Sequence, residues 1–288
     1  MSKSKKSFII SWVLVVILSG VARLSFQTAP VNGLAVTFID VGQGDAILLQ
    51  TPQGENILID SGEDEVFQHK LMKVLALRGV DTIDALVATH YHSDHMGAMK
   101  NVFDNFEVKC LIIPDYEPNN KAKAGLIEAA KKENSQIYEI SEGSAFPHLS
   151  SDLIVSVLHP QKGGFSDNEN DNSLVLMAEY FETTLLLMGD TEEDGEKEIV
   201  QKYDIETDIL KVAHHGSTTS TCKEFLAAAD PTYAVVQCGN GNPYGHPHSE
   251  TIAALEDDDV RIYRTDRDGS VTFLISEKGI EEIKTSQR

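Results

Sequence analysis

The 288-residue sequence contains only three cysteines, and this scarcity excludes several kinds of protein. Cys110, Cys222 and Cys238 are too few, and odd in number, for the disulfide framework of a secreted domain. One disulfide remains open, but three small buried side chains are the simpler expectation. No two of them have the Cys-x-x-Cys spacing of a zinc site, so a metal would be held by other side chains.

Basic residues are also scarce, with 24 Lys and Arg against 45 Asp and Glu, which gives a net charge of −21. Because nucleic-acid backbones attract clustered lysine and arginine, this balance argues against a general nucleic-acid-binding protein. A nuclease is not excluded, since metal ions and local cations can supply the attraction at its site. With 41% hydrophobic and 24% charged residues, the chain can otherwise build a full globular core.

No apolar run is long enough for an ordinary membrane span. Residues 8–22 follow three lysines, but this apolar segment is shorter than the roughly 20 residues that a spanning helix needs. The lysines before the apolar segment and the small residues at the end of that segment predict that residues 1–26 are a signal peptide or an uncleaved anchor in the cytoplasmic membrane. No cysteine follows for lipid attachment. Residues 27–33 are expected to be a linker, and residues 34–288 a domain that is extracellular or on the outer face of that membrane.

Short β-rich runs alternate with amphipathic segments throughout the expected domain. Strands are expected at 34–41, 46–51, 56–60, 83–88, 108–114, 137–140, 153–158, 173–180, 183–188, 209–213, 233–237, 261–264 and 271–275. Helices are expected at 65–77, 96–103, 122–132, 192–203 and 223–229. Two successive halves of this kind predict an α/β fold of the αββα sandwich type, with two sheets packed face to face and helices outside. The strands from 233 onward are expected in the second sheet.

A cluster of metal-binding side chains follows the apolar run 83–88. His90 and His92 are two residues apart, so in extended backbone they point to the same side and can share one ion. Asp94 and His95 come where the chain turns toward a helix, and they can face a second ion nearby. The pattern predicts a metal site at the edge of a sheet.

Two later strands also end in potential ligands. Asp190 follows an apolar strand, where its carboxylate can bridge two ions, although it could instead cap the next helix. His214 and His215 follow the apolar strand 209–213 in the same way. We favour His214 as the ligand because it comes first after the strand, with His215 as its neighbour or as a substrate contact.

Five stretches of the sequence resemble the signature of the metallo-β-lactamase fold superfamily. They are Val41–Asp45, Leu58–Gly62, Thr89–Ala98, Leu187–Asp190 and His214–Ser217. Within that superfamily the chain is similar to the extracellular hydrolase domain of the ComEC-type DNA-uptake proteins of competent bacteria. The resemblance covers roughly residues 34 to 276.

The resemblance implies a set of ligands for two divalent ions. It assigns one ion to His90 and His92, the other to Asp94 and His95, and Asp190 to both. It also assigns one histidine of the 214–215 pair to the second ion.

The resemblance is incomplete in one place, and it leaves one acidic residue with a supporting role. The first ion lacks a third histidine, so either Asp171 completes its shell or the ion is held more weakly; His159 is an outside candidate. Asp60 is expected to orient a histidine ring, or to cap the turn that follows it.

Two stretches are candidates for substrate contacts. Ser217 and Thr218 precede the helix expected at 223–229, where hydroxyl and N–H groups can bind an anion such as phosphate, or simply cap the helix. Tyr244, His246 and His248 lie in a rigid Gly/Pro-rich loop suited to transition-state stabilisation, although solvated loop histidines are the alternative. His248 matches the ComEC-type pattern better than His246, and it is assigned with Asp94 to catalysis.

These features predict a secreted or membrane-tethered dinuclear hydrolase, most simply a phosphodiesterase or nuclease in which a hydroxide bridging the ions attacks phosphorus. Zn²⁺ suits mixed imidazole and carboxylate ligands best, and Mn²⁺ next. DNA is the substrate that the resemblance implies, while cell-wall or teichoic-acid phosphodiesters would suit an acidic exterior enzyme. The missing histidine disfavours an amide or ester hydrolase of the β-lactamase kind, and the nearly complete ligand set disfavours a non-catalytic metal-binding envelope module. Channel-forming segments are absent, which predicts a stand-alone hydrolase without an obligate protein partner.

Overall fold

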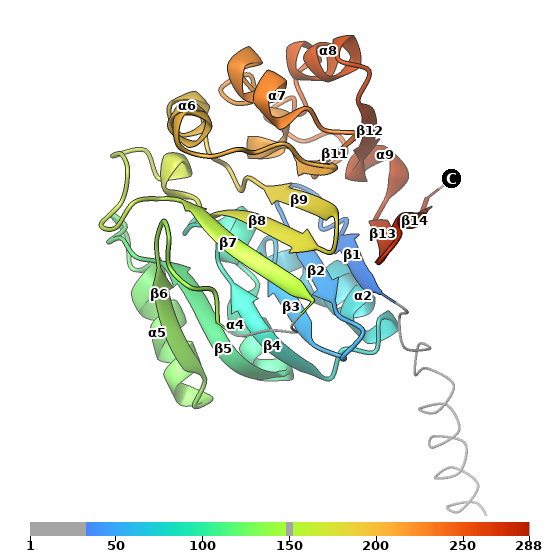
Figure 1. Cartoon of the computed structure of the whole chain (residues 1–288). Helices are drawn as coiled ribbons and strands as arrows, with labels where there is room; N and C mark the ends of the chain where they lie inside the picture. The colour runs from blue at the N-terminus through green and yellow to red at the C-terminus, as the bar shows by residue number, and fades with distance from the viewer. Residues whose placement is uncertain (1–32, 148–151, 288) are drawn as a thin grey trace, which may run out of the picture.

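The computed structural model describes residues 33–147 and 152–287, which form two packed sheets with helices on both outer faces (Figure 1). This is the αββα sandwich that the sequence predicts. The expected signal peptide or anchor and most of the expected linker lie outside the described residues. None of the described helices is both long and apolar enough to cross a bilayer.

The first sheet has eight strands. In spatial order they are β14 (Gly279–Thr285), β13 (Val271–Ser276), β1 (Leu34–Phe38), β2 (Ile47–Gln50), β3 (Asn56–Ile59), β4 (Thr82–Val87), β5 (Glu107–Pro114) and β6 (Gln136–Ile140). The strands from β14 to β3 pair antiparallel, whereas β3 to β6 run parallel to one another.

The second sheet has six strands. In spatial order they are β12 (Arg261–Arg264), β11 (Tyr233–Val236), β10 (Ile209–Lys211), β9 (Thr183–Leu187), β8 (Val175–Tyr180) and β7 (Leu153–His159). Strands β9 to β12 are parallel, and β7 to β9 are antiparallel. Apolar side chains of both sheets, among them Phe38, Val87, Leu187 and Val235, meet in the central core.

Helical segments cover the two outer faces and account for two further apolar layers. The first sheet is covered by η1 (Asp64–Val66), η2 (Phe67–Leu71), α2 (Met72–Leu77), α3 (Ser93–Met96), α4 (Met99–Asn105) and α5 (Ala122–Lys132). The chain that forms the second sheet contributes η3 (Asn170–Asn172), α6 (Glu193–Lys202), η4 (Ala213–Gly216), α7 (Lys223–Ala229), α8 (Ser249–Asp257) and α9 (Thr265–Asp268).

The last strands differ from the expectation. Strand β13 was expected in the second sheet, but it pairs antiparallel with β1 of the first, with Val36 opposite Phe273. This pairing directs Phe273 into the central core and against Phe38, with ring centroids 6.0 Å apart. Helix α8 and strand β14 were not expected. Each buries few apolar side chains, with Leu255 the buried one in α8 and none fully buried in β14.

Candidate metal centre

Parallel strands bring the predicted ligands together. Asp60 follows β3, His90 follows β4 through Thr89, Asp190 follows β9, and His215 follows β10. Because the carboxyl ends of parallel neighbours reach the same edge of a sheet, each sheet presents its own ligands at one edge. The packing of the two sheets then brings the two edges together.

Four buried side chains form the centre of the site. Asp45, His95, Asp190 and His215 each offer one ligand atom, and these atoms all lie within 4.8 Å of one another. The Oδ2 atom of Asp190 lies 3.2 Å from His95 Nε2 and 3.4 Å from His215 Nε2. Asp190 thus lies between these two histidines at the centre of the cluster, and its role as a bridge between two ions stays a prediction.

Several of these buried atoms have no hydrogen-bond partner among the described residues. They include His95 Nε2 and both Asp190 Oδ1 and Asp45 Oδ1. Buried polar atoms without partners are costly, and divalent cations held by His95 and Asp190 would satisfy the atoms of these two side chains. Imidazole and carboxylate ligands of this kind fit Zn²⁺ or Mn²⁺.

His90 and His92 extend the cluster on one side. The Nε2 atom of His90 lies 3.1 Å from Nδ1 of His92, and the rings of His90 and His95 have centroids 4.2 Å apart. On its other side, His90 Nδ1 lies 3.2 Å from the Ser173 hydroxyl, which holds the ring in place. Burial, followed by the nearby His95, lowers the pKa of His90 well below its ordinary value, so the ring is neutral and able to bind a metal.

Asp60 holds His95 from behind. Its Oδ2 lies 2.8 Å from His95 Nδ1, while its Oδ1 accepts a hydrogen bond from the Thr89 N–H. This is the kind of contact expected of Asp60. Burial alone would lower the pKa of His95, but Asp190 and Asp60 on either side raise it well above its ordinary value. The position therefore favours positive charge, which is what a metal ion supplies.

A buried ion pair that the sequence analysis did not identify supports His215. Lys211 Nζ lies 2.6 Å from Asp45 Oδ2, and Asp45 Oδ1 lies 3.3 Å from His215 Nδ1. The same Nδ1 hydrogen bonds to the Gln237 carbonyl oxygen, which leaves Nε2 facing the cluster. Two signals were available in the sequence: Asp45 closes the Gly-Gln-Gly stretch, and Lys211 interrupts an apolar strand.

The geometry favours His215 over His214 as the ligand, in contrast to the expectation from sequence. His215 Nε2 lies 3.2 Å from Asp94 Oδ2, whereas His214 Nε2 is 3.9 Å from Asp190. The chain leaves β10 at Lys211 and turns through 213–216, where both histidines have positive φ. The first histidine is therefore directed to the rim, where its Nδ1 lies 3.2 Å from Glu192.

Asp94 closes the cluster on the solvent side, with its side chain 23% exposed. Burial raises its pKa, but the contact with His215 and the charge of His95 outweigh this and lower the pKa below its ordinary value. Asp94 is thus ionised and faces the pocket beside His92. The peptide carbonyl of Asp94 accepts a hydrogen bond from the Asp45 N–H at 3.1 Å, which ties this turn to the first loop of the domain.

The structure directs Asp171 away from the metal cluster. Its Oδ1 accepts a hydrogen bond from the Glu192 N–H at the start of α6, and its carbonyl oxygen lies 2.7 Å from His159 Nε2. Neither Asp171 nor His159 lines the metal pocket, and the neighbouring Asn170 lines it instead. The expectation that Asp171 completes the shell of the first ion is therefore not favoured by this geometry.

A pocket of about 280 Å³ opens over the cluster, and the loop at 240–248 forms one wall. Tyr244 and His246 line the pocket, with their rings stacked at a centroid distance of 5.6 Å. Burial, then the neighbouring histidines, lower the pKa of His246 to about 4. His248, which directly precedes α8, lies outside the lining, and its Nδ1 accepts a hydrogen bond from the Thr218 N–H. The geometry thus favours His246 over His248 for contact with a substrate.

Ser217 and Thr218 also lie outside the lining of this pocket. The Ser217 hydroxyl accepts a hydrogen bond from the Thr219 N–H at 3.2 Å, and Thr218 lines a separate hollow beside α7. The Thr219 hydroxyl lies 3.0 Å from His214 Nδ1. This run of hydroxyl residues therefore supports the rim of the site through His214.

Comparison with known proteins agrees with this geometry. The model of the metallo-beta-lactamase superfamily matches residues 39–239. The ComE operon protein 3 of Bacillus subtilis (strain 168) is 32% identical over 83% of this chain and 32% of its own length. The competence protein ComA of Neisseria gonorrhoeae is 30% identical over 93% of this chain and 36% of its own length. The chain thus spans about a third of these relatives.

A solved structure shows the same fold. The metallo-beta-lactamase fold protein YhfI from Bacillus subtilis superposes with a TM-score of 0.54 at 12% identity, over 80% of this chain and 96% of that one. The matched residues 39–239 include the strand ends that carry the candidate metal ligands. The chain belongs to the metallo-beta-lactamase superfamily, and competence proteins are among its homologues.

Proposed function

We propose that this protein is a phosphodiesterase that uses two divalent metal ions. The observation that carries the proposal is the group of buried ligand atoms around Asp190. Its Oδ1 has no hydrogen-bond partner among the described residues, and its Oδ2 lies 3.2 Å from His95 Nε2 and 3.4 Å from His215 Nε2. Bound divalent ions activate water and neutralise the charge that develops on phosphate oxygens. Zn²⁺ is the metal that suits this mixture of ligands best, with Mn²⁺ next.

In this proposal the chain's own residues divide the work by position. His90 and His92 would hold one ion, Asp94, His95 and His215 would hold the other, and Asp190, which lies between them, would complete the ligand set. Asp60 and the pair of Asp45 with Lys211 keep the imidazole rings in place from behind.

The pocket lining then handles the substrate. His246 is neutral at pH 7 and can donate one N–H hydrogen bond to a phosphate or leaving-group oxygen. Tyr244, stacked on it and 63% exposed, offers an aromatic face to a base or sugar at the mouth of the pocket. His214 lies at the rim and positions Asn170, 3.5 Å away, rather than an ion.

DNA is the proposed substrate, and the outer face of the cytoplasmic membrane or the extracellular space is the proposed location. The similarity to competence proteins supports both, as does the resemblance to a DNA-uptake hydrolase domain. The second candidate is a cell-wall phosphodiester such as teichoic acid, which an enzyme on the outer face of the membrane would meet. The net charge of −21 opposes both polyanions and does not decide between them.

The test is hydrolysis of bis-p-nitrophenyl phosphate, linear DNA and teichoic acid by the chain from about residue 27, with Zn²⁺ or Mn²⁺ and with EDTA. We expect metal-dependent turnover of the small ester and of DNA, lost in His92→Ala and Asp190→Ala. Turnover of the ester and teichoic acid without DNA would select the second candidate. Metal binding without turnover of any phosphodiester would refute the proposal.

A further inference from the structure

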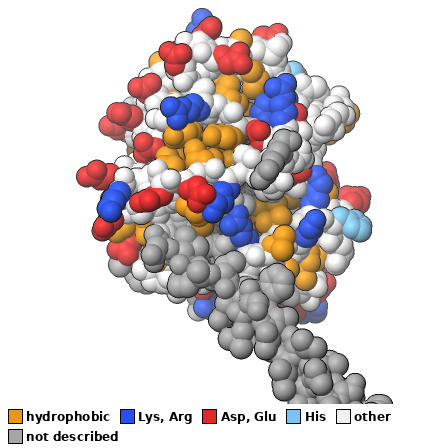
Figure 2. Space-filling model, turned by 90° about the vertical axis from the view of Figure 1, so that its right-hand side faces the viewer, with side chains coloured by type: hydrophobic (Ala, Val, Ile, Leu, Met, Phe, Trp, Pro, Cys, Tyr) orange, Lys and Arg blue, Asp and Glu red, His pale blue; other side chains and the backbone are white. Residues whose placement is uncertain are grey.

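A basic pocket lies on the face of the molecule that carries α2, β13 and β14, away from the lining of the metal pocket. It has a volume of about 380 Å³ and is lined by five basic side chains, His69, Lys70, Lys73, Arg78 and Lys284. Figure 2 shows this side of the molecule, where Lys and Arg side chains lie among apolar and acidic ones. In a chain with 24 basic and 45 acidic residues, such a concentration of cations is unexpected from composition.

Two of these cations are available to a ligand. Lys70 is paired with Asp40 at 2.8 Å and Lys284 with Glu282 at 2.9 Å, but Lys73 and Arg78 have no carboxylate partner among the described residues. Arg78 uses one of its five N–H donors on the Thr272 hydroxyl. The other donors can meet an anion in the pocket.

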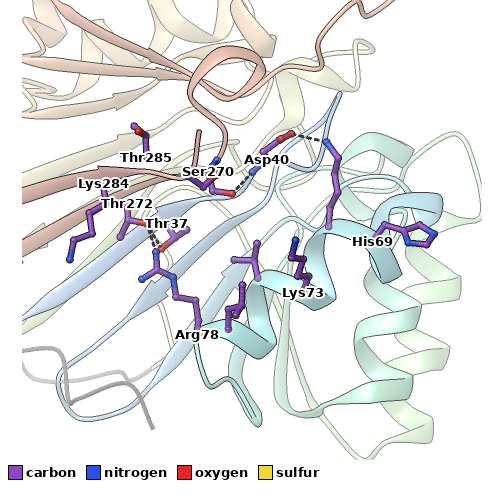
Figure 3. A pocket seen from close by; sticks show the side chains of 13 residues that line it. Thr37, Asp40, His69, Lys73, Arg78, Ser270, Thr272, Lys284 and Thr285 are labelled. Atoms are coloured by element: carbon purple, nitrogen blue, oxygen red, sulfur yellow. Dashed lines mark hydrogen bonds and ion pairs between the residues drawn. The ribbon is translucent and has the colours of Figure 1, made fainter. Parts of the chain in front are cut away.

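The opposite wall carries hydroxyl groups that already have partners: Thr37 and Thr272 are buried and hydrogen-bonded to each other. Figure 3 shows Arg78 and Lys73 on the helical wall, with Thr37, Thr272 and Thr285 on strands across from them. Arginine and lysine are among the side chains that contact nucleic-acid phosphates. The cations of the helical wall therefore supply the attraction for a phosphate, while the strand wall holds Arg78 through Thr272.

The basic side chains form a row that leads toward the metal centre. Lys70 and Arg78 are eight residues apart along one helical segment, a length of about 12 Å. At the Lys70 end the row meets Asp40, and three residues further along the same loop Gln43 lines the metal pocket. Consecutive Cα atoms are 3.8 Å apart, so these two loop positions are separated by at most ~11 Å.

We propose that this pocket is a second phosphate-binding site, which holds a DNA strand several nucleotides from the bond that is cleaved. The proposal rests on the phosphodiesterase function proposed above and extends it to a polymeric substrate. A row of about 12 Å is longer than a single phosphate group, so it can contact successive phosphates of one strand. At 0.1 M salt, screening over about 10 Å limits the repulsion from distant acidic residues, so the local cations decide binding.

Fluorescence anisotropy of a labelled single-stranded 20-mer tests the proposal directly. The protein is kept in EDTA so that binding is measured without cleavage, and the salt concentration is varied. Each lost phosphate contact reduces the slope of log K against log salt by about 0.7, which is roughly a fivefold loss of affinity at 0.1 M salt. We expect that loss for Lys73→Gln, and about twenty-fivefold for Lys73→Gln combined with Arg78→Gln.

The matched control is Lys131→Gln, which removes an exposed helical lysine outside the pocket. It should change neither the affinity nor the slope. Lys73 is itself exposed, so its replacement should not disturb folding, and thermal melting of each variant checks this. Unchanged binding in Lys73→Gln, or an equal loss in Lys131→Gln, would overturn the proposal.

Two further arms separate the proposal from its alternatives. Vesicles containing phosphatidylglycerol test for a lipid surface: binding to them that is lost in Lys73→Gln, with no binding of the 20-mer to the wild type, would overturn the proposal. Turnover of bis-p-nitrophenyl phosphate tests the metal centre separately. If turnover is absent while Lys73-dependent DNA binding persists, the phosphodiesterase function fails and the binding site stands.

Discussion

Lys211 and Asp45 form a buried ion pair behind the metal cluster, and breaking it should be costly. The Nζ and Oδ2 atoms are 2.6 Å apart, with side chains 0% and 1% exposed. Removing one partner leaves an uncompensated buried charge, which costs about 3–5 kcal/mol. Since domains are stable by only about 5–15 kcal/mol, Lys211→Met should lose a large part of the free energy of unfolding.

The assay is urea unfolding of the metal-free protein in EDTA, with Lys211→Met, Asp45→Asn and the double variant as a cycle. We expect the double variant to be less destabilised than the sum of the single variants, because neither charge is then left alone. Burial is the largest influence on the pKa of Asp45 and raises it, but Lys211 and His215 together lower it. Without Lys211 that pKa should rise, so the loss in Lys211→Met should shrink as pH falls. A loss under about 1 kcal/mol, or strict additivity, would refute the assignment of a buried charged pair.

Three other predictions concern the site and its supports. In a chelator competition, His215→Ala should weaken Zn²⁺ binding at least ~100-fold. His214→Ala should weaken it ~10-fold or less, because His214 supports the site from its rim. The reverse order of effects would identify His214 as the ligand. Gly44→Ala should lower the free energy of unfolding by about 1–3 kcal/mol and weaken metal binding. Gly44 has φ of +116°, and an added Cβ would overlap the Asp94 carbonyl oxygen. A melting temperature equal to that of the wild type would contradict this prediction. Burial raises the pKa of Glu196 from 4.5 to about 7. The protonated side chain therefore contributes stability that is present below about pH 4.5 and lost as pH rises to about 7. In urea titrations at several pH values, the free energy of unfolding of Glu196→Gln should lack this decline.

The sequence by itself determined the fold class and much of the secondary structure. Helices α5 and α7 begin and end at the residues predicted for them, because each has a clear apolar period and a defined boundary. The spacing of His90, His92, Asp94 and His95 indicated a metal site for a local reason. Four potential ligands within six residues depend only on backbone geometry that the neighbouring residues set.

Only the tertiary structure decided which distant residues complete the site. Asp45 and Lys211 meet across 166 positions of the chain, and His215 reaches Asp94 across 121 positions. Such contacts depend on how two sheets pack, and no local period encodes that. The turn after β10 reversed the expected order of His214 and His215 because both adopt positive φ, where strand alternation no longer applies. The basic pocket likewise exists because α2 packs beside β1 and β13, which bring together cations that are scattered along an acidic sequence.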